Sequence, residues 1–226
     1  MTTYFKDLSV GADSSKHLAV PQPCGGLYRG CGKRMLDIAF VLAAAPIVVP
    51  LIVICAILVA RDGGSPFFLQ RRIGRGGRTF SIVKLRTMIV SADEALAAHL
   101  SKNPHARQEW EKYQKLRDDP RITRLGTWLR TTSLDELPQL WNVLRGDMSL
   151  VGPRPMMQDQ RNLYPGHAYF SMRPGITGPW QVSERNESTF AERAVYDDAY
   201  YRDLSLGTDL RLLARTVAVV LKCKGC

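Results

Sequence analysis

The segment covering residues 130–155 holds more residues able to carry chemistry than any other part of the chain. It reads RTTSLDELPQLWNVLRGDMSLVGPRP, with the adjacent carboxylates Asp135 and Glu136 followed by Pro138. Because proline is tolerated only in the first turn of a helix, this spacing predicts a helix that starts near Asp135. The free amides at a helix start favour negative charge, so they can keep a carboxylate ionised or gather a phosphate. Simple helix capping is the alternative role for the pair.

Arginines lie around this pair, in rigid turns or just before it. Arg130 precedes the carboxylates, Arg154 lies in the turn Gly-Pro-Arg-Pro, and Arg173 begins the stretch Arg-Pro-Gly-Ile-Thr-Gly. Planar guanidinium groups match phosphate oxygens, and phosphoryl transfer depends chiefly on positioning and charge neutralisation. We therefore predict that Arg130, Arg154 and Arg173 bind substrate phosphates, with Lys84 and Arg86 as weaker candidates.

A carboxylate among arginines can also react. It can attack phosphorus to give an acyl phosphate, which divides one transfer into two steps. A neighbouring carboxylate and a divalent ion would offset the charge of a pyrophosphate, and Mg²⁺ suits such oxygen ligands. Asp135 and Glu136 are thus the predicted catalytic residues and the predicted magnesium ligands.

A long uncharged segment, residues 38–60, is the second unusual feature. Its 23 positions would extend about 35 Å as a helix, against about 30 Å of bilayer hydrocarbon. Pro46 and Pro50 lie inside it. Each proline removes a backbone donor and clashes with the preceding turn, so the helix is expected to kink or break near mid-membrane.

Positive charges flank this segment on both sides. Arg29, Lys33 and Arg34 precede it, and five arginines follow between Arg61 and Arg78. Such charges normally stay on the cytoplasmic side. A re-entrant helix, which enters the membrane and returns on the same side, satisfies both flanks. A single span with an imperfect charge bias is the alternative.

The overall charge restricts the partners. A formal net charge of +10 and a pI near 9.6 imply an anionic partner, such as nucleic acid, anionic lipid or a phosphorylated substrate. The apolar segment favours lipid, because a soluble nucleic-acid binder does not need it. We expect no nucleic-acid partner. A basic membrane-anchored adaptor for nucleic acid or a partner protein is the alternative function, although it would not need adjacent carboxylates beside phosphate-binding turns.

Shorter elements are expected to position the reactive groups. Residues 66–70 and 79–85 read as the two strands of a hairpin around a glycine-rich basic turn. A capping box opens a helix over residues 91–100, and a second charged helix is expected after Pro104. The fold class that these patterns predict is α+β and mostly helical.

Two further helices have apolar faces. In the helix predicted near Asp135, one stripe consists of Leu137, Leu140, Trp141 and Leu144. Residues 209–222 form an amphipathic helix with a narrow cationic stripe. This last helix suits either a membrane interface, with its basic side chains among headgroups, or a core position with one wet edge.

The motifs together resemble those of the bacterial sugar transferase family, the small monotopic phosphoglycosyl transferases, across about residues 33–221. The matching stretches are Lys33-Arg34-x-x-Asp37, the proline-bent apolar helix, Gln70-x-Arg72-x-Gly74, FSIVKLRTM at 80–88, residues 133–155, RPGITGPWQVSERN at 173–186 and the tyrosine-rich segment before the last helix.

This resemblance implies transfer of a sugar 1-phosphate from a UDP-sugar to undecaprenyl phosphate, with release of UMP. By motif position, Asp135 would form a phosphosugar-aspartyl intermediate, with Glu136 as its partner at Mg²⁺. The chain is similar to the minimal catalytic form used in exopolysaccharide assembly, so a galactose or glucose donor is expected. Downstream glycosyltransferases are expected partners, and a homodimer is the oligomeric state considered.

The resemblance also implies a domain organisation. Residues 1–32 would be a flexible tail, residues 33–61 a re-entrant proline-kinked membrane helix at the cytoplasmic face of the bacterial inner membrane, and residues 62–226 a small cytoplasmic catalytic domain with interfacial amphipathic helices. One position departs from the pattern. Many family members place Ser before the first helix-bending proline, whereas Ala45 precedes Pro46 here, so a serine hydroxyl cannot satisfy the freed backbone groups.

Overall fold

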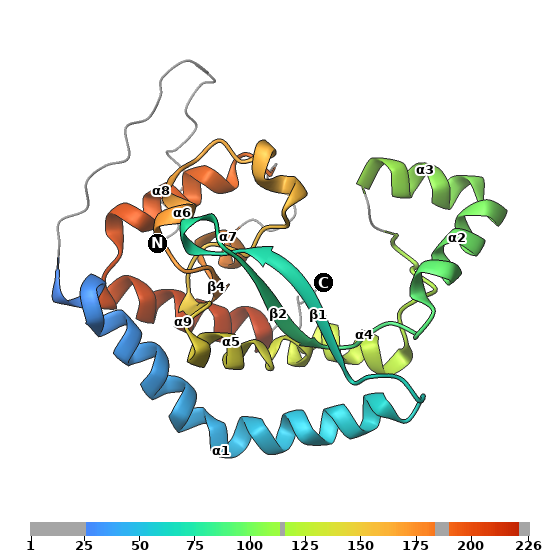
Figure 1. Ribbon diagram of the computed structural model, residues 1–226, viewed down its shortest axis with the longest axis horizontal. Helices are drawn as coiled ribbons and strands as arrows, with labels where there is room; N and C mark the ends of the chain where they lie inside the picture. The colour runs from blue at the N-terminus through green and yellow to red at the C-terminus, as the bar shows by residue number, and fades with distance from the viewer. Residues whose placement is uncertain (1–25, 114–115, 184–189, 222–226) are drawn as a thin grey trace.

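The computed structural model describes residues 26–113, 116–183 and 190–221, and these form a mostly helical α+β protein (Figure 1). The predicted fold class is confirmed at this level. Within the described residues, the strands form an antiparallel pair, β1–β2, and a parallel pair, β3–β4. Their bounds are β1 Phe67–Ile73, β2 Thr79–Leu85, β3 Ser149–Val151 and β4 Gly175–Thr177.

The helices surround these strands (Figure 1). In chain order they are α1 Lys33–Ala60, α2 Ala92–Lys102, α3 Pro104–Tyr113, α4 Arg124–Thr131, α5 Gln139–Arg145, α6 Ala168–Ser171, α7 Pro179–Val182, α8 Arg193–Asp203 and α9 Leu206–Leu221. Tighter or wider helical turns add η1 Tyr28–Gly32, η2 Arg75–Gly77, η3 Leu134–Glu136 and η4 Asp159–Leu163. The charged pair α2 and α3 projects from the rest of the molecule (Figure 1).

Helix α1 contains both Pro46 and Pro50 and is nonetheless continuous. Figure 1 shows that it changes direction part-way along its length. Together with η1 it is the one helix in the described part of the chain that is long and apolar enough to cross a bilayer. Residues 1–25 of the predicted tail lie outside the described residues. Helical structure already begins at Tyr28, before the predicted boundary at residue 32.

The N-terminal half of α1 is bound to the rest of the protein by polar contacts. The Arg34 guanidinium donates to the backbone carbonyls of Val143 and Leu144 at the end of α5. The buried Asp37 carboxylate accepts from the Ser149 hydroxyl at 2.8 Å and from the Leu150 amide at 3.0 Å. These bonds fix the start of α1 against β3.

The C-terminal end of α1 packs on the same body through apolar contacts. Cys55 and Val59 form a buried cluster with Leu85 of β2 and Leu129 of α4. Between the two anchored ends, the large apolar side chains of the middle of α1 are exposed, namely Leu42, Ile47, Val49, Val53 and Ile54. The middle of α1 therefore exposes apolar side chains, while its two ends are attached to the folded core.

The hairpin β1–β2 directs its side chains by the alternation of an extended chain. Arg72 pairs with Phe80, and Phe68 pairs with Lys84. Directly paired residues point to the same face, so Arg72 and Lys84 share a face with Phe80 and the buried Ile82. That face packs on the main core cluster. The predicted hairpin is confirmed, with the first strand extended to Ile73.

The parallel pair β3–β4 depends on glycine at close backbone approaches. A Cβ on Gly175 would lie 2.1 Å from the Gly152 nitrogen, and a Cβ on Gly178 would lie 2.0 Å from the Gly152 oxygen. No side chain fits at such distances. The glycines of the Gly-Pro-Arg-Pro and Arg-Pro-Gly-Ile-Thr-Gly stretches thus serve to bring these two segments together.

Three predictions for the helices need correction. The helix predicted from Asp135 begins at Gln139, because Asp135 lies in the separate turn η3 and Pro138 is the N-cap of α5. Trp141 does not join the buried stripe, since it is 61% exposed while Asn142 and Val143 are buried. In α2, Ser91 occupies the N-cap without a side-chain capping bond, so the predicted capping box does not form.

Helix α9 combines the two environments left open by its sequence. Leu212 is buried in the main core cluster and Leu213 packs against it. Leu210 and Val217 remain exposed. One side of the helix is therefore a core face, and a second side presents apolar side chains to the surroundings.

Candidate active site

Asp135 is placed by a tight reversal between α4 and α5. Ser133 adopts a left-handed conformation with φ of 57°, which is uncommon outside glycine. The turn η3 follows at once and buries Asp135 to 9% exposure. A non-glycine residue held in this conformation stores backbone strain, which is frequent at functional sites.

The environment of Asp135 favours its protonated form. Burial and, to a smaller extent, the neighbouring Glu136 raise the pKa of this carboxyl, while Lys84 and Arg130 lower it. The net effect raises the pKa from 3.8 to about 6. At neutral pH the group is ionised and poorly solvated. A carboxylate in this state is a stronger nucleophile than one exposed to water.

Two cations from other elements accompany the carboxylates. Lys84 of β2 forms an ion pair with Glu136, with 2.7 Å between Nζ and Oε1. Arg130 in α4 donates through Nε to the Thr87 hydroxyl at 2.9 Å, and its charge acts on Asp135. Lys84, Arg130, Asp135 and Glu136 are thus brought together as one group.

A residue not predicted for the site, Arg72, connects this group with Arg154. Arg72 donates to the Gln70 side chain at 2.5 Å and to the Pro155 carbonyl at 3.4 Å. The charges of Arg154 and Glu136 both act on Arg72. Arg154 also lies over the ring of Trp180, 5.8 Å from its centroid.

Arg193 at the start of α8 is a second residue that sequence analysis missed. Its guanidinium lies 4.0 Å from the Trp180 ring centroid and 4.6 Å from that of Phe190. Burial lowers its pKa to about 10, and the charges of Arg154 and Arg72 add to this effect. The Gln-x-Arg-x-Gly stretch is a sequence signal that could have identified Arg72 as a site residue. No short motif marks Arg193.

The other two predicted phosphate ligands lie elsewhere. Arg173 donates to the Gly146 carbonyl at 2.9 Å, at the C-terminal end of α5, whereas Asp135 lies just before the start of that helix. Arg86 forms bonds to both oxygens of Asp62 and to the carbonyls of Val59, Ser65 and Met88. The structure thus does not bring Arg173 or Arg86 to the Asp135 group.

The donor set for a cation consists of Asp135 and Glu136. Among the described residues, no group of three or more His, Cys, Asp and Glu side chains could hold a metal ion. Mg²⁺ is usually bound by one or two carboxylates together with substrate phosphates and water. Glu136 repels the Asp135 carboxylate and so raises the pKa of Asp135. A divalent cation between the two carboxylates would relieve this repulsion, so the pair fits Mg²⁺.

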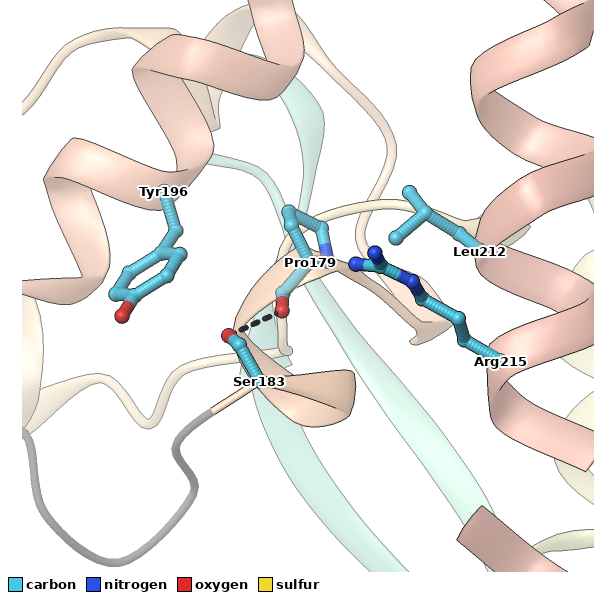
Figure 2. Close-up of a pocket in the computed structure, with 5 residues that line it drawn as sticks. All are labelled: Pro179, Ser183, Tyr196, Leu212 and Arg215. Carbon is cyan, nitrogen blue, oxygen red and sulfur yellow. Dashed lines mark hydrogen bonds between the residues drawn. The ribbon is translucent and has the colours of Figure 1, made fainter. Parts of the chain in front are cut away.

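A separate pocket lies behind α7. Figure 2 shows that Pro179 and Ser183 line it together with Tyr196 of α8 and with Leu212 and Arg215 of α9. The Ser183 hydroxyl donates to the Pro179 carbonyl at 2.6 Å. Its described lining residues include no carboxylate, so the pocket offers no counterpart to Asp135. It marks where α7, which carries Trp180, is held between α8 and α9.

Comparison with known proteins now decides the family. A family model described as "Bacterial sugar transferase" matches residues 28–223. The chain belongs to the bacterial sugar transferase family. The match covers α1, the hairpin, the Asp135 group and the arginines around Trp180. The family resemblance drawn from the motifs is therefore confirmed.

Three relatives named for exopolysaccharide production or sugar transfer are similar to this chain in sequence. The exopolysaccharide production protein ExoY of Sinorhizobium fredii is 42% identical over 211 residues, which cover 91% of this chain and 93% of the relative. A UDP-galactose-lipid carrier transferase of Erwinia amylovora is 46% identical over 195 residues, 85% of this chain and 41% of the relative. A UDP-glucose:undecaprenyl-phosphate glucose-1-phosphate transferase of Caulobacter vibrioides is 36% identical over 231 residues, 96% of this chain and 80% of the relative.

The coverage differs among these relatives. The chain spans nearly the whole ExoY relative but only 41% of the Erwinia transferase. The names themselves agree with a sugar transferase of exopolysaccharide synthesis, as expected from the sequence.

Proposed function

We propose that this protein transfers a hexose 1-phosphate from a UDP-sugar to undecaprenyl phosphate and releases UMP, as the first membrane step of exopolysaccharide assembly. The observation that carries the proposal is the buried Asp135 carboxylate beside the Glu136–Lys84 ion pair and the phosphate-matching arginines. Relatives named for galactose and glucose transfer to a lipid carrier support the reaction class.

In the first step, an oxygen of the Asp135 carboxylate attacks the phosphorus that carries the sugar. A bond forms between this oxygen and phosphorus, while the bond from phosphorus to the oxygen that bridges the two phosphates breaks. UMP leaves with that electron pair, and the sugar phosphate remains on Asp135 as an acyl phosphate. Lys84 and Arg130 hold positive charge beside the transferred group.

In the second step, an oxygen of undecaprenyl phosphate attacks the same phosphorus. The acyl phosphate bond breaks, Asp135 returns as a free carboxylate, and the product is a lipid-linked sugar diphosphate. The two-step route needs only one nucleophilic side chain, because Asp135 is the attacking group first and the leaving group second.

Asp135 and Glu136 would hold Mg²⁺, which suits their oxygen ligands. The ion would supply positive charge that offsets the negative charge of the donor pyrophosphate. Lys84 restrains the Glu136 side chain through the 2.7 Å ion pair between these two residues.

The proposed location is the cytoplasmic face of the bacterial inner membrane, with α1 as a re-entrant helix. The contacts of α1 support this arrangement, because its start bonds to the end of α5 and to β3, while its end packs on β2 and α4. A spanning helix would separate its two ends by the thickness of a bilayer. One small domain that holds both ends keeps them on one side, with the exposed apolar middle of α1 in lipid.

Other exposed apolar side chains suit the headgroup layer. Trp128 on α4, Trp141 on α5 and Leu210 and Val217 on α9 are exposed. Tryptophan is enriched at membrane interfaces because its ring is amphipathic. These helices would lie at the membrane surface near α1, which brings Asp135 to the level of a lipid phosphate.

The test of the reaction is release of UMP by the detergent-purified protein in the presence of Mg²⁺ and undecaprenyl phosphate. A panel of UDP-sugars identifies the donor, and we expect UDP-galactose or UDP-glucose to be used. Asp135→Asn should abolish UMP release while the protein stays folded. Unchanged turnover in that variant would exclude the covalent route. We also propose that downstream glycosyltransferases extend the lipid-linked product and that the protein forms a homodimer.

A further inference from the structure

Two arginines from distant parts of the chain face one buried tryptophan, and a third arginine lies close to them. Arg154 and Arg193 both face the ring of Trp180, at 5.8 and 4.0 Å from its centroid. Arg72 of the hairpin lies close to both, since it donates to the carbonyl of Pro155, the residue after Arg154, and its charge acts on Arg193. Trp180 is only 7% exposed, so its ring serves as a platform for the guanidinium groups.

The described neighbours do not fully satisfy this arginine cluster, defined as Arg72, Arg154 and Arg193. The Nε atoms of Arg72 and Arg193 are buried and have no hydrogen-bond partner among the described residues. Buried polar atoms are normally paired, so an unpaired donor calls for an explanation. The charges also oppose one another, because each of Arg72 and Arg193 has its pKa lowered by burial and by neighbouring arginines.

The position of the cluster relative to the carboxylates indicates which anion fits it. Arg72 shares one face of the hairpin with Lys84, which forms the ion pair with Glu136, and the Glu136 charge acts on Arg72. The cluster therefore adjoins the Asp135 group on the side of β1. A diphosphate donor that presents one phosphorus to Asp135 has its second phosphate one bridging oxygen away. That second phosphate gains charge as the bridging bond breaks, and guanidinium forks match its oxygens.

We propose that the arginine cluster is the subsite for the nucleotide phosphate of the donor, so that Arg72 and Arg193 bind the phosphate of UMP while Asp135 takes the sugar phosphate. This inference rests on the proposed function and extends it, because it separates the residues that hold the leaving nucleotide from those that hold the transferred group. The Asp135 oxygen–phosphorus bond forms as the bridging bond breaks, and the electron pair passes to the UMP phosphate at the cluster.

The subsite is tested by binding of the product, which needs no turnover. Titration calorimetry of the detergent-purified protein compares UMP with uridine, which lacks the phosphate. We expect the wild-type chain to bind UMP at least tenfold more tightly than uridine. Arg193→Gln and Arg72→Gln should each remove most of that difference and leave uridine binding unchanged.

Arg202→Gln is the matched control, since Arg202 lies on the same helix as Arg193 and is exposed. This variant should keep the full preference for UMP. Melting temperatures of all variants identify any loss of folding. Should Arg193→Gln fail to fold, Arg72→Gln, which changes a different element, carries the test.

The outcomes separate the subsite from the reaction. Folded Arg193→Gln and Arg72→Gln variants that keep the wild-type preference for UMP would overturn the subsite, even where the wild-type chain releases UMP from a donor. A wild-type chain that binds UMP through the cluster but releases none from any UDP-sugar would overturn the reaction and leave the subsite standing.

Discussion

At the scale of single residues, the central feature is a carboxylate that the fold makes costly to ionise. Asp135 is buried, lies next to Glu136, and has its pKa raised to about 6. Lys84 and Arg130 partly offset that cost. A group that is destabilised in the free protein can be relieved when a substrate phosphate or cation arrives, and active sites commonly contain such groups.

The first prediction concerns stability. The pKa of Asp135 is 3.8 in the unfolded chain and about 6 in the folded protein, so between these pH values the folded protein binds the proton more tightly. Stability therefore falls as pH rises through this window, and above it the full cost is present. Asp135→Asn stays neutral, so at pH 7.5 without Mg²⁺ we expect it to be more stable by about 1–3 kcal/mol. Chemical denaturation measures this difference.

The gain in Asp135→Asn should disappear below about pH 4, where the wild-type carboxyl is protonated in both states. Asp118→Asn is the control, because Asp118 is exposed, and its stability should match wild type at both pH values. A loss of stability in Asp135→Asn at pH 7.5 would contradict the cost assigned to the buried charge.

The second prediction concerns the pH dependence of turnover. The positive charge of Lys84 lowers the pKa of Asp135, so Lys84→Met should raise that pKa. The acid limb of the UMP-release profile, where the nucleophile becomes protonated, should then shift to higher pH. Lys102→Met, at an exposed position of α2, should leave the profile in place. A shift toward lower pH would refute the role of Lys84.

At the scale of elements, the hairpin β1–β2 connects the long apolar helix α1 to the candidate active site. Lys84 and Arg72 extend from one face of it toward Glu136. Arg86, just beyond β2, binds the last turn of α1 through the Val59 carbonyl and the segment after it through Asp62. The same two strands thus carry active-site cations and fix the exit of α1. The placement of Lys84 and Arg72 on one face depends on the alternation of side chains along the strands.

The third prediction separates two roles for Arg86. Its side chain is 12% exposed and bonds to Asp62 and to three backbone carbonyls, so Arg86→Gln should destabilise the protein by about 2 kcal/mol or more. The KM for the UDP-sugar should stay unchanged in the protein that remains folded. Arg61→Gln, at an exposed position, should alter neither quantity. A raised KM at wild-type stability would instead restore Arg86 as a phosphate ligand.

At the scale of the whole molecule, one compact domain holds both ends of a long apolar helix. Arg34 and Asp37 bind the start of α1, and Cys55 and Val59 pack its end. Under the proposed function, the water-soluble donor and the lipid acceptor must meet at one surface. A re-entrant helix, as proposed, would place Asp135 at that surface.

The fourth prediction tests this topology. Cys31 is exposed just before α1, and Ser65→Cys introduces an exposed thiol just after it. With the remaining cysteines other than the buried Cys55 replaced by serine, a membrane-impermeant maleimide should label both thiols in inside-out vesicles and neither in intact cells. Labelling of the two thiols from opposite sides would show that α1 spans the membrane.

The sequence alone was sufficient for features that depend on local pattern. The adjacent carboxylates, the uncharged length of α1, the alternation of the hairpin and the motif set are properties of neighbouring residues, and each survives in the structure or is matched by the family model. Local pattern was less reliable where a backbone turn intervened. Asp135 lies in its own turn rather than in α5, because Ser133 adopts a left-handed conformation that no side-chain periodicity reveals.

Only the tertiary structure decided which cations share the site with Asp135. Arg72 and Pro155 are 83 positions apart yet hydrogen-bonded, and Arg193 reaches Trp180 from another helix. Arg173, which stands in as suggestive a motif as Arg154, instead caps the far end of α5. An arginine among Pro and Gly residues indicates that its guanidinium is held rigidly. The direction in which that guanidinium points depends on backbone contacts between distant segments, such as those of Gly152 with Gly175. These contacts exist only in the folded chain.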